Sequence, residues 1–169
     1  MIEFSKNSII SNLPRYVPIL LLYISVLNEF DFNYLGVNFF SFNFPFILIF
    51  YWSLKKSESL GYGLIFIAGL FNDVVVGLPI GISSFNYLLI CGFASYLRNI
   101  TLSPSLIKDW IFFLITILVV NSFNYSLLVL FFSYEPELNA LTINLVFTFL
   151  LYFLFAHGFQ FYQKIVFGN

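Results

Sequence analysis

The sequence has little charge: Asp, Glu, Lys and Arg make up 9% of its 169 residues, against roughly 25% in soluble domains. Seven basic and eight acidic residues cannot cover a soluble fold of this size with a polar surface. The net charge of −1 excludes electrostatically driven nucleic-acid binding, and the single cysteine excludes a disulfide scaffold. Because 60% of the chain is hydrophobic, it is neither disordered nor soluble, and we expect it in a lipid bilayer.

The residues that build most catalytic and metal sites are also scarce. His157 is the only histidine and Cys91 the only cysteine, so a His/Cys metal site has too few ligands. No phosphate-binding loop of the GxxxxGK[ST] kind is present. A Ser-His-Asp arrangement stays open only by joining His157 to distant groups. We therefore expect a protein that is not an enzyme and that needs neither a cofactor nor a metal ion.

What the chain has in abundance is long apolar runs. Trp110–Val120 and Leu145–Phe155 are apolar all round, without the alternation of a membrane β-strand, so we predict helices. Pro45 interrupts the second predicted helix and the first is short, so one of them is expected to kink, tilt or lie partly in the interface. The fold class is an all-α integral membrane protein, a single transmembrane domain over residues 1–169. Its helices are predicted at approximately 14–28, 36–54, 60–78, 81–97, 109–132 and 138–163.

The few charges are distributed unevenly between the connections. All seven basic residues fall on alternate connections, and four acids fall on the connections between them. In short loops such a bias places the basic side in the cytoplasm, so both termini are predicted cytoplasmic. The basic residues are Lys6, Arg15, Lys55, Lys56, Arg98, Lys108 and Lys164, and the acids are Glu29, Asp31, Glu135 and Glu137.

Asp73 is the unusual charge, because it lies inside the third predicted helix. A carboxylate there is costly unless it has partners. Gly77, Pro79 and Gly81 follow and can end one helix and start the next. Asp73 is then placed to accept hydrogen bonds from free amides at the start of the following helix, or from Asn72 or Asn86. A proton or ligand site and a contact with a partner protein remain alternatives.

Three further polar residues are candidates for contacts between helices or with a partner. Asn121 and Asn124 lie in the fifth predicted helix, where internal hydrogen bonds and a docking face for another membrane helix are both open. His157 shares one helical face with Gln160 and Lys164. That face is either a polar stripe near the inner headgroups or a contact with another chain.

Two segments resemble a known family, the rod shape-determining protein MreD. Gly69, Asp73, Gly77, Pro79 and Gly81 occupy the positions of the family's G-x-x-x-D-x-x-x-G-x-P-x-G turn. The segment from Phe44 to Trp52, FPFILIFYW, is similar to the family's proline-led second helix, which ends in a Tyr-Trp pair. Length, helix number and polarity match over nearly the whole chain.

The resemblance implies a non-enzymatic scaffold or regulator of the bacterial elongation machinery in the inner membrane. Proteins similar to MreD pair with the bitopic protein MreC and act with MreB filaments, the RodA glycosyltransferase and its paired transpeptidase. They maintain rod shape and lateral peptidoglycan synthesis. The alternative is the substrate-binding membrane subunit of an energy-coupling-factor vitamin transporter, although few alanines are available for its coupling surface. On either interpretation we expect the protein to contact the lipid bilayer and not to bind nucleic acid.

Overall fold

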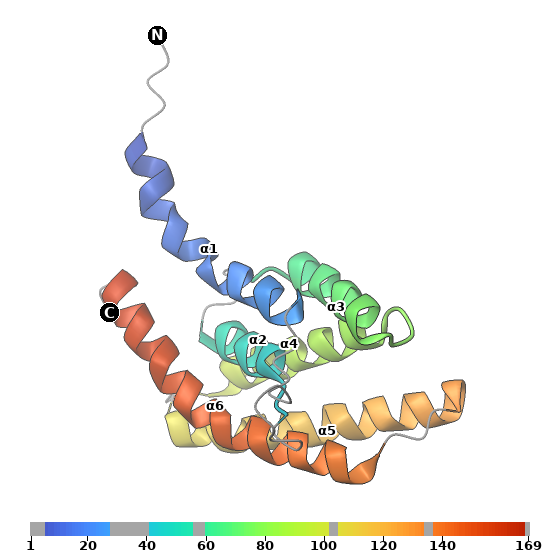
Figure 1. Cartoon of the computed structure of the whole chain (residues 1–169). Coiled ribbons are helices and arrows are strands. Elements are labelled where there is room, and N and C mark those ends of the chain that lie inside the picture. The colour runs from blue at the N-terminus through green and yellow to red at the C-terminus, as the bar shows by residue number, and fades with distance from the viewer. Residues whose placement is uncertain (1–5, 28–40, 56–59, 102–104, 134–136, 168–169) are drawn as a thin grey trace.

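The computed structural model describes residues 6–27, 41–55, 60–101, 105–133 and 137–167, and for residues 6–15 and 167 the backbone alone. Six α-helices form this described part, in agreement with the predicted helix number. Figure 1 shows them as a bundle in which α3, α4 and α5 run roughly side by side. The helices are α1 (Lys6–Leu27), α2 (Phe44–Lys55), α3 (Tyr62–Val76), α4 (Ile82–Ile100), α5 (Leu106–Phe132) and α6 (Leu138–Phe167).

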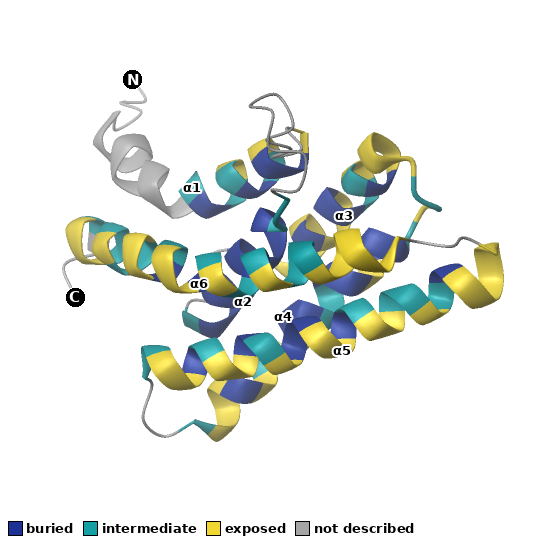
Figure 2. Ribbon diagram, turned by 60° about the horizontal axis from the view of Figure 1, so that its bottom comes forward, coloured by how far each residue is buried: buried dark blue, intermediate teal, exposed yellow. Residues whose placement is uncertain are grey.

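The short helix α2 is the centre of the bundle. Eleven of its twelve residues, from Phe44 to Leu54, are buried, and α2 packs against α1, α4 and α6. Aromatic side chains of α2 contact two helices that come later in the chain: Phe50 meets Phe113 of α5 at a ring-centroid distance of 5.1 Å, and Tyr51 meets Phe159 of α6 at 5.2 Å. In Figure 2 the buried ribbon accordingly concentrates at α2 and on the faces turned toward it.

The predicted start of the second helix at residue 36 is wrong in its described part, because residues 41–43 are not helical and α2 begins at Phe44. Asn43 caps the helix, since its side-chain oxygen accepts the Phe46 amide at 3.3 Å. Pro45 therefore lies in the first turn, where a missing N–H costs nothing, and does not interrupt the helix. Residues 36–40 of the predicted helix lie outside the described residues.

The ends of other helices also differ from the predicted ones. α1 begins at Lys6 and not near residue 14, and α6 continues to Phe167 and not 163. α5 begins at Leu106, which places Asp109 inside its first turn. α3 and α4 agree with their predictions within a few residues at each end. Of the charged residues used for orientation, Lys56, Glu29, Asp31 and Glu135 lie outside the described residues, as do the side chains of Lys6 and Arg15.

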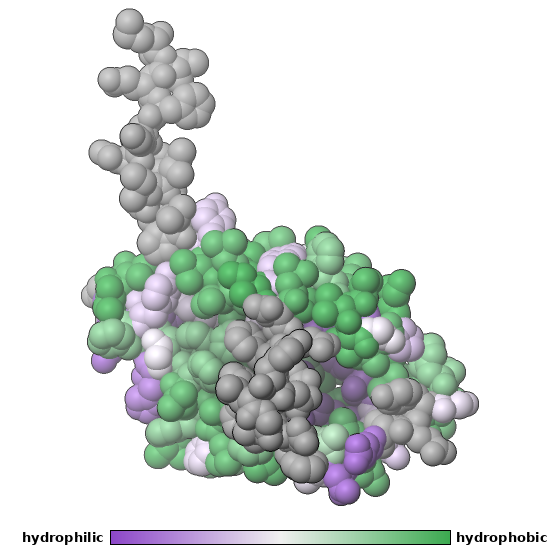
Figure 3. All heavy atoms as spheres, viewed as in Figure 1, coloured by the Kyte–Doolittle hydropathy of each residue, from purple (hydrophilic) through white to green (hydrophobic). Residues whose placement is uncertain are grey.

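Two helices, α5 and α6, are long and apolar enough to cross a membrane by length and composition. α2, α3 and residues 16–27 of α1 are apolar but shorter. Large apolar side chains remain exposed along the outside, among them Leu130 (77%) on α5 and Leu154 (64%) on α6. Hydrophobic residues cover much of the face visible in Figure 3. Such a surface is suited to contact with acyl chains and not with water.

Candidate functional site

The turn between α3 and α4 is built around the carboxylate of Asp73, which is fully buried. One carboxylate oxygen accepts the backbone N–H of Gly81 at 2.6 Å. The other accepts the N–H of Ser83 at 2.8 Å. These are amides at the start of α4, which have no acceptor within their own helix. Asp73 therefore caps the neighbouring helix from α3, and the two hydrogen bonds are among those predicted from the sequence.

Two glycines of the same turn adopt backbone conformations that other residues rarely take. Gly77 ends α3 with φ of 74°, and its N–H donates to the carbonyl oxygen of Asp73. Gly81 precedes α4 with φ of 103°. The Leu78 N–H also donates to the Asp73 carbonyl, at 2.9 Å. Asp73 thus receives hydrogen bonds at both its backbone and its side chain, and the positive φ values explain why glycine is suited to positions 77 and 81.

Gly69 lets α3 and α4 approach more closely than any side chain would permit. A Cβ atom added to Gly69 would lie 2.3 Å from the Cα and 2.5 Å from the N of Ser84. The Ser84 hydroxyl donates to the carbonyl oxygen of Phe66 on α3 at 2.9 Å. The motif glycine is therefore a packing residue that brings the polar atoms of the two helices within hydrogen-bonding distance.

Ser83 and Ser84, in the first turn of α4, do not cap this helix with their side chains. Ser83 contributes its backbone N–H to Asp73, while its hydroxyl accepts the side-chain amide of Asn72 at 2.9 Å. Asp73 from α3 takes the capping role instead. The geometry favours the structural role of Asp73, since both of its carboxylate oxygens have backbone partners. The ligand and partner-contact alternatives stay predictions.

The remaining predicted residues do not join this turn. Asn121 and Asn124 are half-buried on α5, and among the described residues the Oδ1 atom of Asn124 has no hydrogen-bond partner. His157 is exposed on α6, where its Nδ1 lies 3.2 Å from the carbonyl oxygen of Phe153. A role for Asn121, Asn124 or His157 in binding a partner stays a prediction.

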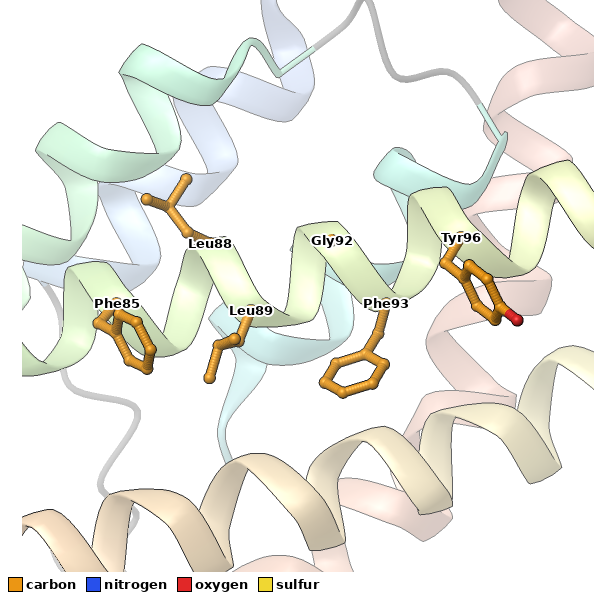
Figure 4. Close-up of a pocket in the computed structure, with 6 residues that line it drawn as sticks. All are labelled: Phe85, Leu88, Leu89, Gly92, Phe93 and Tyr96. Carbon is orange, nitrogen blue, oxygen red and sulfur yellow. The ribbon is translucent and has the colours of Figure 1, made fainter.

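An open apolar groove runs along the outward face of α4, with a volume of about 540 Å³. Figure 4 shows Leu89 and Phe93 pointing to the side of α5 and Leu88 pointing to the opposite side. Gly92 lies between them, and an added Cβ there would meet nothing within 4 Å. The lining residues are Phe85, Leu88, Leu89, Gly92, Phe93 and Tyr96.

Neither this groove nor an ion pair at the end of the bundle opposite the Asp73 turn was predicted from the sequence. The Nζ of Lys55 on α2 lies 2.6 Å from Oδ2 of Asp109 on α5, and the Asp109 side chain is only 2% exposed. Nearby, Arg98 of α4 donates to the carbonyl oxygen of Ser53 at 3.3 Å. The ends of α2, α4 and α5 are thus joined by basic side chains. Nothing in the sequence around either residue signalled the pair, because its two members are 54 positions apart.

Comparison with known protein families matches residues 9–165 of the 169-residue chain to the rod shape-determining protein MreD. The chain belongs to the MreD family. The membership inferred from the resemblance is therefore confirmed. No curated protein matches the chain, and no solved structure does.

Membership brings a role in rod shape determination and a place among membrane proteins. The MreD family is a family of shape-determining proteins and is not a known enzyme family. The match gives no support to the vitamin-transporter alternative. Within the MreD fold, the Asp73 turn and the α4 groove are two separate features: the first holds helices together, and the second leaves a helix face open.

Proposed function

We propose that this MreD-family chain is a non-enzymatic scaffold of the bacterial elongation machinery, which maintains rod shape by directing lateral peptidoglycan synthesis. The observation that carries the proposal is the family match over residues 9–165. The partner is an MreC-like bitopic protein, and through it MreB, RodA and the paired transpeptidase. Scaffold function requires a surface that holds a partner in the bilayer, and the α4 groove is the described surface best suited to this.

The groove suits a single transmembrane helix. Its lining runs from Phe85 to Tyr96 on one helix, a distance of roughly 16 Å or three helical turns. Gly92 has open space above it, and a small residue allows a second helix backbone to approach closely. Acyl chains are as apolar as a transmembrane partner helix, so burial of apolar surface does not favour the partner over lipid. The affinity therefore depends on how closely the surfaces of the two helices fit together.

Regulation follows if the partner helix binds one state of the synthase assembly better than another. A ligand shifts an equilibrium only by its differential affinity for the two states. The scaffold then biases the synthase by holding the MreC-like helix in the arrangement that favours activity. The rigid Asp73 turn supports this role, because it ties α3 to the helix that carries the groove.

The proposal includes six transmembrane helices in the inner membrane, with both termini in the cytoplasm. The described basic residues Lys55, Arg98 and Lys108 lie in the last turn of α2, the last turn of α4 and the first turn of α5. Figure 1 shows these helix ends on the side of the bundle away from the turn between α3 and α4. This separation supports the orientation, because Lys and Arg are enriched on the cytoplasmic side. α2 has twelve residues and is about 18 Å long, so as a helix it covers only part of the ~30 Å hydrocarbon core.

Depletion of the protein in its host is the direct test of function. We expect rounded, widened cells with normal vitamin uptake, measured by microscopy and by radiolabelled uptake in the same culture. Rod-shaped cells with a defect in uptake would overturn the scaffold proposal and favour the transporter alternative. Re-expression of the wild-type chain from a plasmid is the control, and it should restore the rod shape.

Partner capture tests the groove. Gly92→Leu fills the groove, so we expect at least several-fold less MreC-like protein to copurify with the variant. Gly63→Leu is the matched control, since Gly63 lies on α3 and also has open space for a side chain. If the MreC-like protein still copurifies with Gly92→Leu but not with the double variant Asn121→Leu/Asn124→Leu, the contact lies on α5 and not in the α4 groove.

A further inference from the structure

The last helix is longer than a membrane crossing requires. α6 has 30 residues and is therefore about 45 Å long, whereas the hydrocarbon core is about 30 Å thick. A straight helix of this length would need a tilt of roughly 48° to stay inside the core, beyond the usual range of 0–40°. Part of α6 must therefore leave the hydrocarbon.

The contacts of α6 with α5 show which part this is. Trp110, in the second turn of α5, stacks on Phe149 at a ring-centroid distance of 4.5 Å and donates its indole N–H to the Phe149 carbonyl at 2.9 Å. Trp110 also contacts Phe153 at 5.7 Å. The level of Phe153 is thus close to the end of α5 that carries Lys108 and the Lys55–Asp109 pair. Residues 154–167 of α6, here called the C-terminal segment, continue for about 21 Å past that level. The preceding residues 138–153 are about 24 Å long, a mismatch with the core that local thinning of the bilayer accommodates.

One side of the C-terminal segment packs on the bundle. Phe159 and Tyr162 lie 6.2 Å and 6.3 Å from the ring of Trp52 on α2. The side-chain oxygen of Gln163 accepts the Tyr51 hydroxyl at 3.2 Å. These contacts fix the direction of the segment, and Figure 1 shows it turned away from the direction of α5.

The opposite side of the segment is exposed and has two kinds of surface. Phe161 and Ile165 are each 67% exposed, four residues apart and so on one face. His157 and Lys164, seven residues apart, are exposed on the same side of the helix, and their mean direction is turned by about 70° around the helix axis from that of Phe161 and Ile165. A segment that projected into the cytoplasm would leave Phe161 and Ile165 in water, and a segment that stayed in the hydrocarbon would bury Lys164 there.

We propose that the C-terminal segment binds the surface of an anionic phospholipid bilayer and lies along its headgroup layer. Phe161 and Ile165 insert between the acyl chains, while His157 and Lys164 face the phosphates and water, as in other amphipathic interfacial helices. Lys164, with Lys108 and Arg98 at the same end of the bundle, complements the negative charge of such a surface. The inference depends on the membrane location of the protein and not on any partner of the scaffold.

Depth-dependent fluorescence quenching tests the proposal on the full-length chain in vesicles of phosphatidylcholine and phosphatidylglycerol. The native cysteine is replaced in Cys91→Ser, which keeps a polar partner for the Ser53 hydroxyl. Single cysteines in Phe161→Cys, Ile165→Cys, His157→Cys and Leu150→Cys then carry an environment-sensitive dye. If Cys91→Ser lowers the folded yield, the native background serves instead, because Cys91 is only 3% exposed.

The expected result separates the four positions. Dyes at positions 161 and 165 are quenched most by lipids with a nitroxide near the headgroup, and the dye at 157 most by iodide in the water. The control dye at Leu150 lies about 4.5 Å before the level of Phe153, on the side of the bilayer centre, and is quenched most by lipids whose nitroxide lies deeper along the acyl chain than the one that quenches positions 161 and 165. Strongest quenching of 161 and 165 by deep nitroxides, or by iodide alone, would overturn the proposal.

A change of lipid tests the role of charge. Vesicles of phosphatidylcholine alone should lower the shallow quenching at position 161 relative to vesicles that contain phosphatidylglycerol. Equal quenching in the two lipids would overturn the electrostatic part of the proposal. No partner protein is present in these vesicles, so the outcome is independent of whether the α4 groove binds an MreC-like helix.

Discussion

Asp73 combines complete burial with two backbone partners, and this determines what substitutions there should do. Asp73→Ala leaves the buried Ser83 amide without an acceptor, at about 1–3 kcal/mol, and also frees the half-buried Gly81 amide, at a smaller cost. Asp73→Asn keeps one acceptor oxygen but turns an NH₂ group toward the second amide, so we expect a smaller loss. The measurement is thermal unfolding in detergent, followed by a thiol-reactive dye on Cys91, which is 3% exposed. Three equal midpoints would contradict the capping role.

Gly69 allows a prediction with a control in the same helix. Gly69→Ala places a methyl group 2.3 Å from the Cα of Ser84, so α3 and α4 must separate, at about 1–3 kcal/mol. Gly63→Ala meets nothing within 4 Å and should leave stability unchanged or raise it by about 0.5–1 kcal/mol. The Cys91 unfolding assay measures both variants. If Gly69→Ala were as stable as Gly63→Ala, the close approach of the two helices would not be needed.

At the scale of elements, the Lys55–Asp109 pair connects α2 to α5. Lys55→Met leaves the Asp109 carboxylate, 2% exposed, without its cation, which costs about 3–5 kcal/mol. The double variant Lys55→Met/Asp109→Leu removes both charges and should recover most of that loss, because a buried pair can be replaced by apolar residues. Lys164→Met, at an exposed position, is the control. Stability measurements that show additive losses in the double variant would rule out a direct interaction.

How far the sequence predicts this fold depends on how local each feature is. The Asp73 turn can be predicted because its residues lie within about a dozen positions of one another. Its glycines and proline indicate where one helix ends and the next begins. The start of α2 was misplaced because apolar residues continue before it, while the decisive signal was the cap at Asn43.

Features that depend on the relative placement of distant helices were not predictable. Lys55 and Asp109 are 54 positions apart, and nothing in either segment specifies the other. The groove on α4 depends on where α3 and α5 lie beside it. Helices that are apolar all round carry no stripe that distinguishes a lipid contact from a protein contact. Asn121 and Asn124 marked α5 as polar, but polarity alone does not identify the partner.

At the scale of the whole molecule, the proposed orientation in the membrane rests on the separation of charge between the two ends of the bundle. Lys55 and Arg98 are joined to neighbouring helices at one end, while the Asp73 turn closes α3 and α4 at the other. A chain that inserted with the opposite orientation would move the basic end across the bilayer, against the bias that governs short loops.

Reporter fusions measure this orientation. A tag inserted at residue 57, 103 or the C-terminus should be active only if the tag works in the cytoplasm. A tag at residue 79 or 135 should be active only if it works outside. Because each additional or missing span reverses the side of every later connection, the five positions together test whether each of the four helices from α3 to α6 crosses the membrane, as well as the orientation. A periplasm-active tag that works at residue 57 or 103 would contradict six spans with both termini inside.

Replacing Lys55 and Arg98 with neutral residues should weaken the excess of basic residues on the cytoplasmic side. We then expect a mixture of orientations in the same assay.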